Sequence, residues 1–126
     1  MSRLLLDTNV AVWLLLGDRE RVSDPAASAM EDERNEVALS AASVWEIAIK
    51  RALGRLTIED RWAAALTRLG FDPLPVTAIH AQAVENLPWH HRDPFDRLLV
   101  AQASVEGRML VSADPRLAAY EVEVLW

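Results

Sequence analysis

Short apolar runs that alternate with helical segments are the feature that most constrains the fold of this chain. Each run is short enough for a β-strand, and the runs lie at residues 3–6, 36–39, 109–111 and 122–126. The segments between them repeat apolar residues every three or four positions, which is the spacing of helices. Strands that alternate with helices favour parallel β-α units whose sheet is covered on both faces. The sequence therefore predicts an α/β fold of three layers, α/β/α, with a mostly parallel central sheet.

Helix boundaries follow from capping residues and glycines. Asp93 and Pro94 supply the N-cap and first residue of a helix that ends at Gly107, and Val10 to Leu16 form an uncharged helix that should be covered on most sides. Residues 71–76 contain two prolines, so a strand there would be short or at the edge of the sheet. We expect further helices at residues 24–34, 40–53, 57–69 and 77–86.

Composition limits the class of protein. A length of 126 residues and a hydrophobic fraction of 52% predict a single domain, residues 1–126, with a sizeable core. The absence of cysteine excludes disulfides and thiolate metal sites and fits a cytoplasmic protein. The first apolar run is too short for a signal peptide, and no uncharged stretch approaches the roughly 18 residues that cross a bilayer. We expect no membrane association.

The formal net charge of −6 disfavours a protein that coats nucleic acid regardless of sequence, since such binding depends on basic residues that neutralise phosphates. It does not exclude an enzyme that acts on nucleic acid, because metal ligands can account for part of the acidic excess. Basic residues can still cluster locally, as Lys50, Arg51 and Arg55 do. That cluster is either a phosphate-binding rim or a solvated helix end.

Four acidic residues stand beside the predicted strands or early on helices: Asp7, Glu46, Asp96 and Asp114. Each has a structural alternative. Asp7 and Asp114 can be N-caps, and Asp96 can simply favour the positive end of its helix. Glu46 forms a capping-box pattern with Ser43, but the apolar periodicity begins three residues before that serine and places Glu46 inside the helix.

Taken together, the four acids indicate a metal site. The working site of an open α/β sheet lies beyond the carboxyl ends of its strands, and carboxylates gathered there disfavour one another's ionisation. A cation that prefers oxygen ligands, Mg²⁺ or Mn²⁺, removes this conflict, whereas zinc is disfavoured without cysteines or a suitably spaced histidine pair. Carboxylate-held Mg²⁺ predicts hydrolysis of a phosphodiester by an activated water.

Four segments resemble, in order and at similar spacing, the motifs of the PIN-domain ribonucleases, and within them the VapC-type toxins of bacterial toxin–antitoxin pairs. They are Leu4-Leu5-Leu6-Asp7-Thr8-Asn9 and the stretches at residues 39–50, 91–103 and 110–114. The resemblance implies a PIN-like α/β/α fold, Mg²⁺- or Mn²⁺-dependent endoribonuclease activity on RNA, inhibition by a cognate antitoxin, and a homodimer.

Carried over position by position, the resemblance makes Asp7, Glu46 and Asp96 the core catalytic, metal-binding acids and Asp114 the more variable fourth. It also matches Thr8 and Ser112 to hydroxyls that help to hold ligands or water. Asp93 and Asp96 lie three residues apart on one helix face, and the family's spacing assigns the ligand to Asp96 and the cap to Asp93.

The sequence also allows other interpretations of the function and of individual residues. The chain could be a non-catalytic module that holds a partner segment in the crevice, or a nuclease outside a toxin–antitoxin pair, including one directed at DNA. His90 and His91 either position RNA or relay a proton, or they lie in a solvent-facing loop with one histidine bonded to the backbone. Arg97 either meets a phosphate or pairs with Asp93. Trp13, Trp45 and Trp62 are expected as core or dimer-interface anchors.

Overall fold

A five-stranded parallel sheet forms the centre of the computed structural model, which describes all of residues 1–126. Neighbouring strands are parallel throughout, in the order β3-β2-β1-β4-β5. The parallel sheet predicted from the apolar runs is therefore confirmed, and Pro73 lies on an edge strand as its missing N–H requires. The strands are β1 Arg3–Leu6, β2 Glu36–Ser40, β3 Asp72–Leu74, β4 Met109–Val111 and β5 Val124–Leu125.

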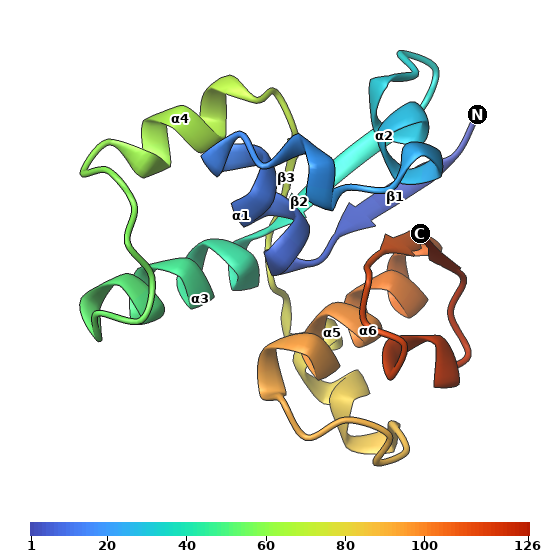
Figure 1. The fold of residues 1–126 in the computed structure, drawn as a ribbon. Helices are drawn as coiled ribbons and strands as arrows, with labels where there is room; N and C mark the ends of the chain where they lie inside the picture. The colour runs from blue at the N-terminus through green and yellow to red at the C-terminus, as the bar shows by residue number, and fades with distance from the viewer.

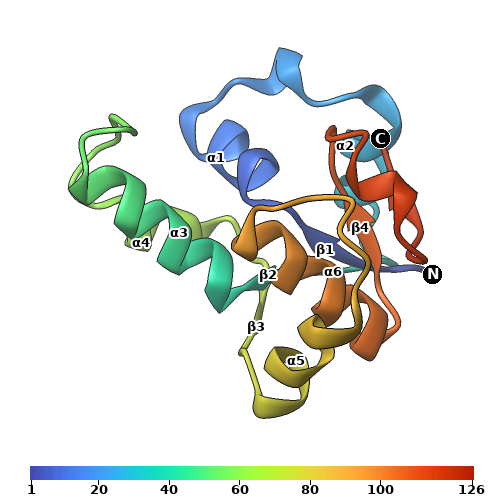
Figure 2. The ribbon, with the colours of Figure 1, turned by 90° about the horizontal axis from the view of Figure 1, so that it is seen from below.

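Helices cover both faces of this sheet, as Figures 1 and 2 show from two directions. Glycine ends the first and last of them in the left-handed conformation, Gly17 after α1 and Gly107 after α6. The helices are α1 Thr8–Leu16, α2 Asp24–Glu31, α3 Ala41–Ala52, α4 Trp62–Arg68, α5 Ala78–Ala83 and α6 Pro94–Glu106, with short 3₁₀ turns η1 Arg19–Arg21, η2 Val84–Asn86 and η3 Leu117–Ala119.

The sheet separates two hydrophobic cores. Successive residues of β1 face opposite sides, so Leu4 and Leu6 pack with Ile47 in one core while Leu5 packs with Leu99 in the other. The first core lies under α1, α2, α3 and α4, and the second lies under α6 and η3. This arrangement confirms the predicted α/β/α layers. No helix is both long and apolar enough to span a bilayer.

Two predicted helices differ from the structure. The helix expected from residue 57 begins only at Trp62, because Arg51 donates to the Ile58 carbonyl at 3.2 Å and pairs with the Asp60 carboxylate, which holds this segment as a loop. The helix α1 is not covered on most sides. Its second half is only partly buried and Leu16 is 47% exposed, although Trp13 packs against Trp126 at a centroid distance of 5.8 Å.

The α3–α4 pair projects away from the rest of the molecule in both ribbon views (Figures 1 and 2). An apolar groove of about 810 Å³ runs between α3, α4 and β3. Trp45 lines it and is 61% exposed, so the core alternative is wrong for Trp45 and the dimer-interface alternative stays a prediction. Trp13 and Trp62 pack partly buried against the first core.

Candidate active site

Asp7 occupies the end of β1 and is almost completely buried, with 3% of its surface exposed. Its Oδ1 accepts the Val10 N–H at 2.9 Å, so it caps α1 as one of its two predicted roles requires. Its Oδ2 accepts a short hydrogen bond from the Ser112 hydroxyl. Burial raises the pKa of Asp7, and the nearby charges of Asp114 and Glu46 raise it further.

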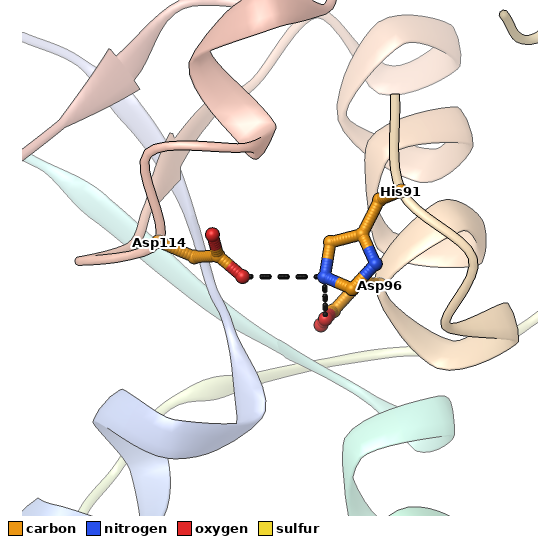
Figure 3. A group of neighbouring side chains, drawn as sticks. All are labelled: His91, Asp96 and Asp114. Atoms are coloured by element: carbon orange, nitrogen blue, oxygen red, sulfur yellow. Dashed lines mark hydrogen bonds and ion pairs between the residues drawn. The ribbon is translucent and has the colours of Figure 1, made fainter. Parts of the chain in front are cut away.

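Hydrogen bonds and one close histidine–carboxylate contact link Asp7 to the opening turn of α6. Ser112 Oγ accepts the Asp114 N–H at 3.1 Å, and Asp114 Oδ2 lies 3.2 Å from His91 Nε2. The same His91 nitrogen lies 3.0 Å from Asp96 Oδ2. Figure 3 shows that one nitrogen of the imidazole faces both carboxylates. Residues from three separate parts of the sequence therefore meet beyond the carboxyl ends of β1 and β4.

Asp96 has the most perturbed acidity of the group. Desolvation by burial and the charge of Asp93 raise its pKa to about 7, with smaller contributions from Asp7 and Glu46, while His91 acts in the opposite direction. Asp93 itself caps α6, since its Oδ1 accepts the N–H groups of Phe95 at 2.8 Å and Asp96 at 3.2 Å. The predicted cap at Asp93 is thus confirmed.

Asp114 differs from the other acids because donors from the protein surround it. Arg116 donates to it from the backbone N–H at 2.9 Å and from both arms of its guanidinium, Nε at 3.1 Å and Nη2 at 3.0 Å. These bonds and the one from His91 hold the pKa of Asp114 below its ordinary value, Arg116 being the main cause. Among the predicted ligands, Asp114 therefore has the fewest carboxylate lone pairs left to bind an ion.

Glu46 points inward from the second turn of α3 and is 4% exposed. The N-cap of α3 is Ser40, whose Oγ accepts the Ala42 N–H at 3.0 Å, so Glu46 lies inside the helix and not in a capping box. Lys50 Nζ lies 2.6 Å from Oε2, but the buried Oε1 has no hydrogen-bond partner. An unpartnered buried carboxylate oxygen is costly, and a cation among the acids would relieve that cost.

The acids gather at one edge without forming one tight cluster. His91, Asp96 and Asp114 place one potential ligand atom each within 4.8 Å of one another. Asp7 and Glu46 lie outside that group yet close enough for their charges to act on Asp96. The carboxylate oxygens of these acids form a donor set that suits Mg²⁺ or Mn²⁺.

The hydroxyls singled out by resemblance are buried beside the acids. Thr8 Oγ1 donates to Ser43 Oγ at 3.0 Å, and Ser112 supports Asp7 as described above. Lys50 is engaged by Glu46 and Arg51 by Asp60, so of the predicted basic rim only Arg55 extends freely into solvent.

For His91 the alternative of a solvent-facing side chain is wrong, and the alternative of a role on RNA stays a prediction. His91 is 6% exposed and contacts two acids, whereas His90 stays in solvent and packs edge-on against Tyr120. One part of the prediction holds, since His91 Nδ1 accepts a backbone N–H, that of Asp93, at 3.1 Å. The signal available in the sequence was position: His91 stands two residues before a helix cap, where a side chain can turn back onto the opening turn.

Both predicted roles of Arg97 are also wrong. Arg97 is 4% exposed, and its guanidinium donates to the backbone carbonyls of Pro88, Val84 and Leu87, the first at 2.8 Å. The Trp89 ring covers it, with its centroid 3.9 Å from the central carbon of the guanidinium. Arg97 therefore fixes the loop that carries His91.

The fold and the acidic edge define a PIN domain, and the PIN-domain family model matches residues 4–123. This chain belongs to the PIN-domain family. It is 32% identical, over 95% of its length and 93% of the relative's, to "Ribonuclease VapC22" of Mycobacterium tuberculosis.

Solved toxin–antitoxin structures share this fold. The crystal structure of VapBC2 from Rickettsia felis, bound to a promoter DNA fragment, superposes with a TM-score of 0.73 at 15% identity, covering 97% of this chain and 96% of that one. A toxin–antitoxin complex from Klebsiella pneumoniae gives 0.66 at 22% identity, covering 95% and 93%.

Proposed function

We propose that this protein, a single PIN domain over residues 1–126, is the ribonuclease toxin of a toxin–antitoxin pair and hydrolyses RNA phosphodiester bonds with carboxylate-held Mg²⁺ or Mn²⁺. Membership of the PIN family and the 32% identity to a VapC ribonuclease support the reaction class. The observation that carries the metal dependence is the buried Glu46 Oε1, which has no partner while its charge acts on Asp7 and Asp96.

Asp7, Glu46 and Asp96 are the residues that would hold the ion, with Asp114 as a fourth acid. Asp7 is fixed for this role by Val10 and Ser112, and Asp96 by the capped first turn of α6. When bound, the dication supplies an activated water for in-line attack and stabilises the leaving oxygen. Lys50, paired with Glu46 at 2.6 Å, balances part of the negative charge before RNA arrives.

The proposed partners are RNA, a cognate antitoxin and a second copy of the chain, all in the cytoplasm. The solved complexes with the same fold contain toxin–antitoxin pairs, which supports an antitoxin partner. The apolar groove beside Trp45 is an exposed apolar surface of the kind that protein partners bind, which also supports a protein partner.

Incubation with total RNA tests this function directly. The wild-type protein should cleave RNA with Mg²⁺ or Mn²⁺, and EDTA should stop the cleavage. Asp7→Asn should be inactive with either ion while remaining folded. Metal-independent cleavage, or an Asp7→Asn variant that cleaves at the parent rate, would show the assignment to be wrong.

A further inference from the structure

His91 sits where a metal ligand could sit. Its Nε2 lies 3.0 Å from Asp96 Oδ2 and 3.2 Å from Asp114 Oδ2, and the three atoms form a compact set (Figure 3). A nitrogen can bind a metal only through an unprotonated lone pair, so the position of the imidazole proton decides what His91 can do.

The hydrogen bond on the far side of the ring fixes that proton. The backbone N–H of Asp93 donates to His91 Nδ1 at 3.1 Å, so Nδ1 keeps its lone pair. The proton of the neutral ring must then be on Nε2, which faces the two carboxylates. In this tautomer Nε2 is a donor and cannot ligate an ion.

The rest of the loop holds the ring in place. The His91 N–H donates to Tyr120 Oη at 3.0 Å, and Arg97 Nη1 donates to the same oxygen at 3.3 Å. Arg97 also binds the Pro88 carbonyl at 2.8 Å, just before the loop reaches His91. A ring flip that exchanged the two nitrogens would break the bond to Asp93 and leave its N–H without a partner.

We propose that His91 is a positioning residue: its Nε2–H donates to Asp114 Oδ2, and the same nitrogen lies against Asp96 Oδ2, which leaves Asp96 Oδ1 for the ion. No protein donor binds Asp96 Oδ1, whereas both oxygens of Asp114 are engaged by Arg116. Second-layer donors of this kind orient a ligating carboxylate and tune its affinity. This inference rests on the proposed metal-dependent function.

The tautomer can be measured on the full-length protein. The chain contains three histidines, so long-range ¹H–¹⁵N correlation spectra with His91→Asn as the assignment control would identify the His91 signals. We expect a pyrrole-type Nε2 and a pyridine-type Nδ1 both without metal and with saturating Mg²⁺, which is diamagnetic. A His91 ring that carries its only proton on Nδ1 in the Mg²⁺ state would have an Nε2 lone pair free to ligate the ion, and the inference would be overturned.

Two substitutions of His91 test the roles of its two ring nitrogens separately. Asn at this position can accept the Asp93 N–H in an Asx turn but is too short to reach the acids, whereas Gln can present an amide N–H near the Nε2 position. Calorimetric titration with Mn²⁺ should show His91→Asn weakening binding by about 10-fold, and His91→Gln restoring most of the loss.

Wild-type Mn²⁺ affinity in His91→Asn would contradict the positioning role. Asp7→Asn separates this failure from failure of the proposed function. If Asp7→Asn binds Mn²⁺ as tightly as the wild type, the metal site itself is wrong, and the positioning role falls with it. If Asp7→Asn loses binding while His91→Asn keeps it, only the role of His91 is wrong.

Discussion

The protein contains two buried histidines with almost the same local geometry and very different surroundings. His80 is 2% exposed and His91 6%. Each accepts a backbone N–H on Nδ1, from Thr77 at 3.0 Å and Asp93 at 3.1 Å. Each places Nε2 near a carboxylate, His80 at 3.2 Å from Glu106. Burial and a carboxylate neighbour therefore do not distinguish a functional histidine from a structural one.

The difference lies in how completely the neighbouring polar groups are satisfied. Beside His80, Gln102 donates to the Pro75 carbonyl at 3.2 Å, approaches His80 Nδ1 at 3.3 Å and accepts from Ser40 Oγ at 2.5 Å. This network joins α6 to the N-cap of α3 and leaves no buried atom without a partner. The surroundings of His91 instead contain crowded acids and the orphan oxygen of Glu46. Unbalanced charge thus distinguishes the proposed metal site from the satisfied network around His80.

The largest expected effect is on RNA cleavage, and it should follow from neutralising the carboxylate beside His91 but not the one beside His80. Asp96→Asn should lower Mg²⁺-dependent RNA cleavage by more than roughly 100-fold, because loss of a ligand exceeds the usual 10- to 100-fold cost of a second-layer change. Glu106→Gln, the matched change beside His80, should leave cleavage per folded molecule unchanged. Single-turnover cleavage assays measure both. Equal losses in the two variants would remove the distinction between the regions.

Metal addition should stabilise the folded protein, and this gain should depend on the acidic edge and not on the surroundings of His80. At one hundred times its Kd, Mn²⁺ should raise the free energy of unfolding of the wild type by about 2.7 kcal/mol. Glu106→Gln should gain as much, whereas Asp7→Asn should gain much less. Urea denaturation with and without the ion gives these values, and a wild-type curve that Mn²⁺ does not move would favour a non-catalytic binding module.

Disrupting the hydrogen-bond network around Gln102 should lower the free energy of unfolding and leave metal binding unchanged. Gln102→Ala removes the acceptor of the buried Ser40 hydroxyl, so we expect a loss of about 1–3 kcal/mol in the free energy of unfolding. Ser104→Ala on the exposed side of the same helix is the control and should change little. Urea midpoints report the loss. A Gln102→Ala protein as stable as the control would mean that the network contributes nothing.

The last expected effect is a pH dependence of the metal-free protein. The pKa of Asp96 is about 7 in the folded state against an ordinary 3.8, so between these values the folded protein holds a proton that the unfolded chain has lost. The free energy of unfolding should therefore fall as pH rises from about 4 to about 7. Asp96→Asn should have a shallower slope over this window in urea titrations. Parallel wild-type and variant curves would contradict the raised pKa.

The sequence by itself determined the strands, their parallel arrangement and the edge where the acids lie. Apolar runs and helical periodicity depend on neighbours a few residues away, so β1, β2 and β4 were predicted close to their observed bounds. Since every strand of a parallel sheet ends at the same edge, residues that follow strands gather there. The cap at Asp93 and the glycine at the end of α6 are equally local signals.

Only the tertiary structure decided which polar groups meet. His91 reaches Asp114 across 23 positions of sequence, and Ser112 reaches Asp7 across 105. Arg97 takes loop carbonyls in place of a phosphate because burial demands that its donors be filled by whatever the fold brings near. Periodicity carries no information about such partners, since they depend on how distant segments pack. The place of His91 between two acids therefore emerges only in the folded chain.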